Sequence, residues 1–347
     1  MKRFKNIVLV CFVVAIAAIY ALPAQSASAA SSAALSIVPK KNYTIEAGKS
    51  INDKLVVRNL DGKTPLQLTL RVVDFTFTDD GGTPKLMLAE DAPQTTWSLK
   101  PFMTVPKTVT IKPNSSKSLD MSVSIPKGHG AGSYYSAIVY SSGAPDGGNV
   151  GLSASGVTLV FTSIPGKVDE NLKLEQFGAY DLNAKKPGYV FVATSKPEAI
   201  AYTLKNNGNV TESPAGSITL KDMFGREQVI GNVNPSKSLA LINQKRTFTA
   251  CIKLKSEQVE FEGGSTKSTA CADPDLWPGF YTASLDVFYG QNGNKTQEIV
   301  STAYFFYLPW WFIIILVIVL MVIVYFVWRV VRAVKQRKRT SRTSRRR

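Results

Sequence analysis

Histidine is almost absent from this sequence of 347 residues, and cysteine is rare. His129 is the only histidine, so a catalytic triad with a histidine base would have to include it. No second histidine and no cysteine pair accompanies it to complete a zinc site. Since no nucleophile, base and orienting group can be recognised together, we predict no enzymatic activity, no cofactor and no metal.

Most of the chain also lacks an excess of basic residues, although the net charge is +16. Three basic residues lie among the first five positions and ten among the last 19, and neither end carries an acid. The long segment between the two ends has a net charge of only about +3. A nucleic-acid-binding domain carries a basic surface, so we expect neither a nucleic-acid partner nor a small-molecule substrate.

Between residues 30 and 307 we find no convincing 3.6-residue apolar period of an amphipathic helix. Short runs alternate apolar with polar residues instead, between clusters of Gly, Pro, Asn and Asp. In residues 119–125 the apolar side chains fall on one face, and Pro126 ends the run. The pattern predicts an all-β fold of two tandem Ig-like β-sandwich domains, followed by one C-terminal transmembrane α-helix.

Two weak internal repeats indicate the number of domains. Residues 55–62 and 202–208 are both strand-like runs that end in Asn and Gly, which favour tight turns. Gly132-Ser133-Tyr134 and Gly279-Phe280-Tyr281 each open a later strand, in the same order and about 147 residues apart. We therefore predict related domains over 30–165 and 166–307, with an insertion at 255–276 in the second.

The first 29 residues are typical of a secretory signal peptide. A basic start, Lys2-Arg3-Phe4-Lys5, precedes an apolar run over residues 7–22. Ala27-Ser28-Ala29 then supplies small residues for cleavage. An uncleaved anchor helix is the alternative interpretation of this segment.

A second apolar run predicts a transmembrane helix over residues 308–328. Residues 310–328 carry no charge, and at ~1.5 Å per residue they match a bilayer core of ~30 Å. Trp310, Trp311 and Trp328 lie at the ends, where tryptophan favours the membrane interface. The basic tail 329–347 then places the C-terminus in the cytoplasm and both β domains outside the cell, the topology of a single-pass type I membrane protein.

The basic tail has no acidic residue, so the simplest interpretation is a stop-transfer segment held to anionic lipid. A cytoplasmic nucleic-acid arm is the alternative. The residues that we expect to contact lipid headgroups are Arg329, Arg332, Lys335, Arg337, Lys338 and Arg339.

Cys251 and Cys271 are the only cysteines that remain once the signal is removed. Outside the cytoplasm such a pair predicts a disulfide, with two free surface thiols as the alternative. Alternation places Cys251 on the polar side of its strand, opposite Phe248, Ala250 and Ile252. The bond would therefore close an inserted loop.

Three further features invite a ligand site and have simpler explanations. His129 lies in a glycine-rich loop that leads into a strand, so we expect an exposed flexible turn. Asp79-Asp80-Gly81-Gly82 lacks the spacing of a calcium loop and predicts a hairpin turn. Four N-x-S/T sequons matter only in a eukaryote, and the alanine-rich signal is typical of bacteria; they begin at Asn42, Asn114, Asn209 and Asn294.

Aromatic residues of the first domain are candidates for a glycan-binding face, although we expect most of them in the core. Tyr134 and Tyr135 are consecutive in a strand, so one of the two must face outward and mark a contact surface. The set comprises Phe75, Phe77, Trp97, Phe102, Tyr134, Tyr135 and Tyr140.

The whole layout resembles the WxL-interacting proteins of Gram-positive bacteria. At residue level the resemblance rests on three segments, residues 57–62, Pro126 with 132–134, and residues 206–208 with 214–218. It implies a first domain that binds peptidoglycan and a second that binds a surface protein. The cysteine-bounded insertion departs from the family's pattern.

Two functions compete at this stage. The first is a membrane-anchored bacterial surface protein whose outer domain, residues 30–165, folds alone and holds peptidoglycan or a wall-associated protein. The second is a structural stalk or accessory subunit of a membrane-protein assembly. The ligand-binding residues of either cannot be assigned from the sequence.

Overall fold

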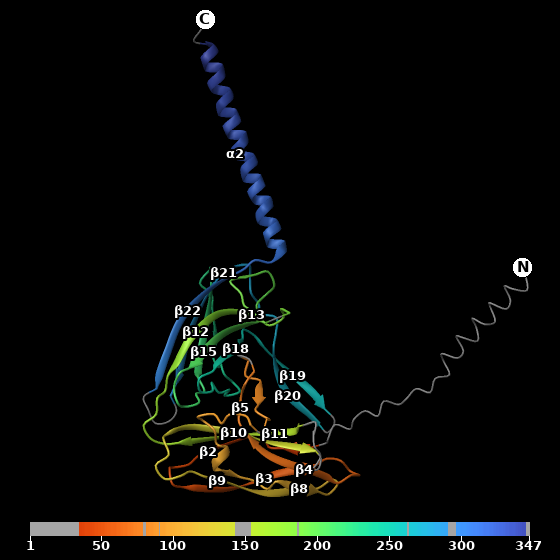
Figure 1. The fold of residues 1–347 in the computed structure, drawn as a ribbon. Coiled ribbons are helices and arrows are strands. Elements are labelled where there is room, and N and C mark those ends of the chain that lie inside the picture. Colours follow the sequence, from red (N-terminus) through yellow and green to blue (C-terminus); the bar gives the residue numbers. More distant parts are fainter. Residues whose placement is uncertain are drawn as a thin grey trace, which may run out of the picture.

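The computed structural model describes residues 35–78, 81–89, 91–142, 154–185, 187–261, 264–290 and 296–344. The predicted signal peptide lies outside these residues. The chain forms two tandem Ig-like β-sandwiches and one long C-terminal helix, α2 (Trp310–Ser344), as predicted. Figure 1 shows α2 leaving the end of the second sandwich, with the first sandwich on the side away from it.

The first sandwich packs a four-stranded sheet against a five-stranded one. In spatial order the smaller sheet consists of β1 (Leu35–Ile37), β3 (Ser50–Asn59), β9 (Ser116–Ser124) and β7 (Met103–Thr104). The larger consists of β2 (Lys40–Thr44), β11 (Ala154–Ile164), β10 (Gly132–Ser142), β4 (Leu66–Val73) and β8 (Thr108–Ile111). The predicted alternation of β9 is confirmed, because Leu119, Met121 and Val123 are all buried. A small hairpin, β5 (Phe75–Phe77) and β6 (Pro84–Leu86), and a 3₁₀ turn (Lys100–Phe102) complete this half.

The second sandwich has the same plan. Its four-stranded sheet consists of β13 (Gly188–Tyr189), β12 (Leu172–Asp181), β15 (Ala199–Asn206) and β18 (Lys245–Cys251). Its five-stranded sheet consists of β14 (Val192–Ala193), β22 (Gln297–Tyr307), β21 (Gly279–Tyr289), β16 (Ala215–Asp222) and β17 (Glu227–Ile230). The inserted hairpin of β19 (Leu254–Phe261) and β20 (Gly264–Cys271) follows β18.

The sequence repeats occupy equivalent places in the two sandwiches. Asn59 ends β3 and Asn206 ends β15; each is fully buried, and its side-chain oxygen accepts the N–H two residues on. Gly132 opens β10 and Gly279 opens β21, and each pairs with the end of the following long strand. Both pairs are 147 residues apart, so the two repeats keep the same spacing in the two sandwiches.

Strand β10 is buried on both faces, unlike a normal strand of a two-layer sandwich. Ile138 and Tyr140 enter the core of the first sandwich. Tyr135, Ala137 and Val139 face the other way and are at most 1% exposed. Their cover is the β5–β6 hairpin together with residues of the second sandwich, namely Leu239, Leu241 and Ile242. The two sandwiches therefore share an apolar cluster.

Hydrogen bonds fix the same junction. Ser133 N–H donates to Asn209 O at 3.0 Å, and Thr211 N–H donates to Ser133 Oγ at 3.0 Å. A Cβ at Gly132 would lie 2.8 Å from Asn209 O, so the backbones approach too closely there for a side chain. Phe77 N–H donates to Gln244 Oε1 at 2.9 Å.

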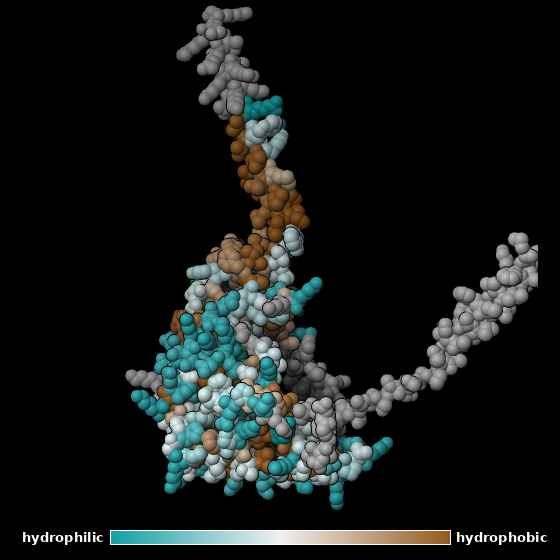
Figure 2. Space-filling view, in the orientation of Figure 1, coloured by the Kyte–Doolittle hydropathy of each residue, from teal (hydrophilic) through white to brown (hydrophobic). Residues whose placement is uncertain are grey.

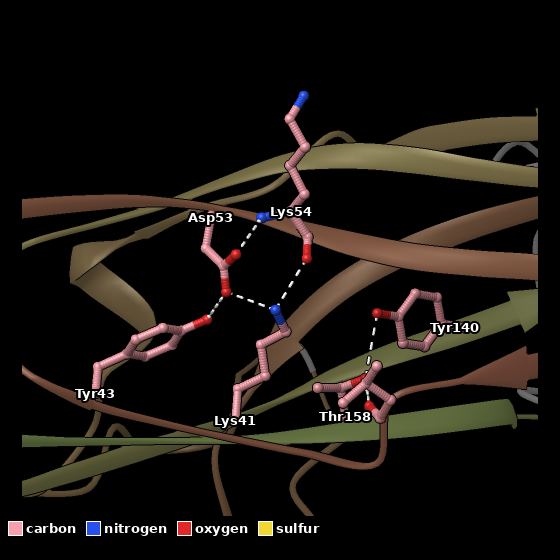
Figure 3. A network of polar contacts seen from close by, with 7 residues as sticks. Lys41, Tyr43, Asp53, Lys54, Tyr140 and Thr158 are labelled. Carbon is pink, nitrogen blue, oxygen red and sulfur yellow. Dashed lines mark hydrogen bonds and ion pairs between the residues drawn. The ribbon is translucent and has the colours of Figure 1, made fainter.

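A polar network holds the first strands across the edge of the first sandwich (Figure 3). Lys41 Nζ and Tyr43 OH, both on β2, each lie 2.5 Å from Asp53 Oδ2 on β3. These two hydrogen bonds lower the pKa of Asp53 to about 2. Thr158 Oγ1 donates to Val38 O at 2.7 Å, which ties the connection between β1 and β2 to β11.

Only two residues, Leu308 and Pro309, separate β22 from helix α2. Leu308 N–H still donates to Ala193 O at 2.8 Å, and Pro309 O accepts the N–H groups of Phe312 and Ile313. Its first 24 residues, Trp310–Ala333, are long and apolar enough to span a membrane. The helix continues to Ser344, so most of the predicted basic tail extends it.

Candidate functional site

A groove of about 720 Å³ runs along the junction of the two sandwiches. The first sandwich contributes Lys40 and Asn42, which lie on β2. The second contributes the start of β16 and the connection between β17 and β18, through Ser213, Pro214, Ala215, Gly216, Ser217, Gly231, Asn232, Asn234, Pro235, Lys237 and Leu239. A ligand in this groove would therefore contact both sandwiches.

Two lysines give the groove its charge. The Lys40 ammonium lies 5.0 Å from the centre of the Phe161 ring, and partial desolvation there lowers the pKa of Lys40. Lys237 is exposed on the opposite wall, at a left-handed backbone position with a φ of 47°. Among the residues that the structure describes, no acidic side chain lines this groove. The arrangement favours an anionic or hydrogen-bonding ligand.

Asn234 fixes the wall that carries Lys237. Its Nδ2 donates to Pro214 O and to Ser238 O at 3.0 Å, and its Oδ1 accepts Ser238 N–H at 2.8 Å. The side chain is buried, so these bonds shape the loop and leave little of it for a ligand. Asn42 and Asn232 are exposed in the groove and remain the amides suited to contact a ligand.

The predicted disulfide between Cys251 and Cys271 is present, with a Cα–Cα separation of 5.1 Å. Phe248, Ala250 and Ile252 are buried, which confirms the prediction that Cys251 lies on the other, polar side of its strand. The bond joins the end of β18 to the end of the inserted β19–β20 hairpin. It stabilises an insertion and takes no part in the groove.

His129 is less exposed than predicted. It does lie in a turn, but its ring packs edge-on between the rings of Phe102 and Tyr134, at 4.8 and 4.6 Å. Within the described residues no group of three or more His, Cys, Asp or Glu could hold a metal. Asp79 and Asp80 of the predicted hairpin turn, and Asn294 of the last sequon, lie outside the described residues.

The predicted aromatic contact surface needs correction. Tyr135 does face outward from its own sandwich, but the shared apolar cluster covers it completely. Tyr134 packs against the core on the other side, and Phe75 and Tyr140 are buried. Alternation correctly identified the face of β10 that points away from its own core. That face is apolar, and its burial against the second sandwich removes it from water.

The three tryptophans predicted to lie at the membrane interface stand near the two ends of the apolar stretch of α2. Trp310 begins α2 and is 69% exposed, and Trp311 follows it. At the other end the Arg332 guanidinium lies 4.9 Å from the Trp328 ring, and Arg329 Nε donates to Tyr325 OH. The helical backbone also includes Lys335, Arg337, Lys338 and Arg339.

Sequence reasoning missed the groove residues Lys40 and Lys237. The two are almost 200 positions apart and neither lies in a recognisable motif, so no local signal could have paired them. Only the fixed docking of the two sandwiches brings them to one groove.

No protein-family model and no curated protein matches the chain. Among solved structures, it is similar to a chain of the chaperone–tip adhesin complex of CFA/I fimbriae biogenesis and to the class 5 fimbriae chaperone CfaA. Sequence identities are 12% and 13% and TM-scores 0.34 and 0.33; each likeness covers 77% of this chain, and 97% and 98% of the other. The E. coli chaperone DraB gives 11% identity and a TM-score of 0.32, over 77% of this chain and 96% of its own. TM-scores this low carry no conclusion about function.

Proposed function

We propose that this chain is a membrane-anchored bacterial surface protein that binds peptidoglycan or a wall-associated protein, a role like that of WxL-interacting proteins. Helix α2 is the anchor, and the positive-inside rule directs its basic end to the cytoplasm. Both sandwiches then lie outside the cell, with the first one farther from the membrane (Figure 1).

The groove between the sandwiches is the main support for the proposed binding role. Lysine side chains attract carboxylates, and exposed amides and hydroxyls bind other amides and hydroxyls. Peptide stems and sugars of a cell wall present all of these groups. Because Lys40 and Lys237 come from different sandwiches, we propose that the outer domain supplies only part of the site.

A pull-down of the full-length chain in lipid nanodiscs on purified cell wall tests this proposal. We expect the wall to retain the chain, and the double variant Lys40→Gln/Lys237→Gln to lose most of that retention. Lys63→Gln removes an exposed lysine from a turn of the first sandwich, outside the groove, and serves as the control. Equal retention of both variants, or none of the parent chain, would refute the proposed site.

The stalk function makes a different prediction. A stalk subunit would lose its partners when α2 is exchanged for an unrelated apolar helix, whereas a wall-binding protein would keep its ligand.

A further inference from the structure

The end of the second sandwich nearest α2 exposes five large apolar side chains. Their exposed fractions range from 51% to 70%, although large apolar residues are usually buried. We call this group the apolar rim; it consists of Phe191, Val192, Met223, Phe224 and Trp277. None of these residues belongs to the groove or to the shared apolar cluster.

Three separate segments bring the rim to one end of the sheet. Val192 lies in β14, which pairs in parallel with the last residues of β22, directly before α2. Gly279 pairs with Tyr307 at the same end, and a Cβ on Gly279 would lie 2.6 Å from Met223 Sδ. The backbone N–H of Trp277 donates to Tyr281 OH at 2.8 Å, which holds the third segment beside them.

A series of aromatic ring contacts extends from the rim along the neighbouring strands β21 and β22. The ring of Phe191 lies 5.6 Å from that of Phe306, which in turn lies 5.1 Å from Phe280. Phe280 then stacks on Tyr304 at 5.6 Å. In Figure 2 the apolar surface of α2 continues onto the end of the sandwich below it.

The link to α2 sets the height of the rim above a bilayer. Leu308 and Pro309 span at most about 7 Å when extended, and the Leu308 N–H is bonded to Ala193 beside the rim. If Trp310 lies at the membrane interface, the rim must lie within a few ångströms of the same interface. Exposed Trp and Phe side chains are stable there.

The charges near the rim do not oppose contact with lipid. Three acidic side chains at this end are each paired with a base: Asp273 with Lys196 at 2.9 Å, Asp275 with Lys253 at 2.7 Å, and Asp222 with Arg226 at 2.6 Å. Each pair limits the repulsion between a carboxylate and an anionic headgroup.

We propose that the apolar rim inserts into the outer interface of the membrane that α2 spans, so that the second sandwich is seated on the lipid. This inference rests on the proposed membrane anchoring and adds to it a lipid-binding surface on the folded domain. Such seating would hold the groove at a fixed height and orientation above the membrane.

Single-tryptophan variants of the full-length chain test the inference. In each variant one tryptophan is kept and the other four are changed to Phe. The chain is reconstituted into vesicles of phosphatidylcholine and phosphatidylglycerol whose acyl chains carry bromine near the headgroups. Bromine quenches tryptophan only on contact, so a loss of emission reports that the retained tryptophan has entered the lipid. The retained residue is Trp277 in the rim, Trp311 in the helix, or Trp97 in the sandwich junction.

We expect emission to be lost from Trp277 and Trp311 and unchanged from Trp97. Quenching of Trp311 without quenching of Trp277 would overturn the rim insertion and leave the anchor intact. No quenching at either position would refute the anchor itself, and the seated rim with it.

A second measurement uses the unaltered chain and so avoids variants that fold poorly. A photoactivatable phospholipid in the same vesicles should label peptides that contain Phe224 or Trp277. Val300 is similarly exposed on the same sheet, at 66%, but lies toward its far end, and its peptide should stay unlabelled. Cross-linking of rim peptides to a second copy of the chain, without lipid labelling, would contradict the proposal.

Discussion

The two sandwiches have similar strand arrangements, yet the outer face of the larger sheet is buried in the first and exposed in the second. In the first sandwich this face of β10 is covered by the β5–β6 hairpin and by the second sandwich. In the second, β21 alternates strictly, so Ser284, Asp286 and Phe288 remain exposed where their counterparts are buried. The residues on this one sheet face therefore decide whether the face is covered by the other sandwich or stays in contact with water.

The largest effect should come from placing a charge on that face. Ala137 and Ser284 occupy equivalent positions, 0% exposed in the first sandwich and exposed in the second. Ala137→Asp buries an unpaired carboxylate in the shared cluster and should lower the free energy of unfolding by about 3–5 kcal/mol. Ser284→Asp should change it by less than about 1 kcal/mol in denaturant titrations of the full chain. Equal losses would show that the two faces do not differ.

The inserted hairpin is a second difference, because only the second sandwich carries a disulfide. Its cysteines are separated by 20 residues, and closing a loop of that size stabilises the folded state by ~3 kcal/mol in the chain-entropy model. Cys251→Ala/Cys271→Ala should therefore lower the free energy of unfolding by about that amount. Dithiothreitol should affect the parent chain and leave the variant unchanged. A variant as stable as the oxidised parent would show that the bond adds nothing.

Among the described residues, each sandwich also buries one acid, and the two acids differ in their hydrogen bonding. Asp74 accepts bonds from Ser98, Ser136 and Thr95, whereas Glu212 accepts one, from Gly290 N–H at 3.1 Å. Burial is the main cause that raises the pKa of Glu212 from 4.5 to about 7.

The raised pKa of Glu212 gives the chain a pH-dependent stability. Between pH 4.5 and 7 the folded state keeps a proton on Glu212 that the unfolded state has lost, so stability falls as pH rises. We expect a decrease of about 2–3 kcal/mol across that window, at about 1.4 kcal/mol per pKa unit. Glu212→Gln should remove this decrease; a variant with the same pH profile would contradict the assignment.

The smallest effect belongs to the polar network of the first sandwich. Tyr43→Phe removes one hydrogen bond to Asp53 and should destabilise the chain by ~1 kcal/mol. The pKa of Asp53 is lowered, so its contribution is complete above about pH 4 and is lost as pH falls through about 2. Asp53→Asn should be less stable than the parent at pH 6 and nearly equal to it at pH 2. A difference that persists at pH 2 would exclude ionisation as the cause.

Features set by local pattern could be predicted from the sequence, and features set by docking could not. Alternation in residues 119–125 predicted a strand with one buried face, and the two cysteines predicted their bond. The strand that Gly132 opens was also predicted, but the burial of its outward face was not, because part of its cover comes from the second sandwich. The groove could not be predicted, because Lys40 and Lys237 come to line it only when the two sandwiches dock. The rim left a weaker signal, which is a large apolar residue within a turn, as at Phe224.

Calorimetry of the full-length chain tests most directly whether the two sandwiches form one body through the shared cluster. We expect a single unfolding transition, with a calorimetric enthalpy equal to the van't Hoff enthalpy, because neither sandwich can unfold without exposing the other's apolar surface. Two separate transitions, each matching one sandwich, would contradict it.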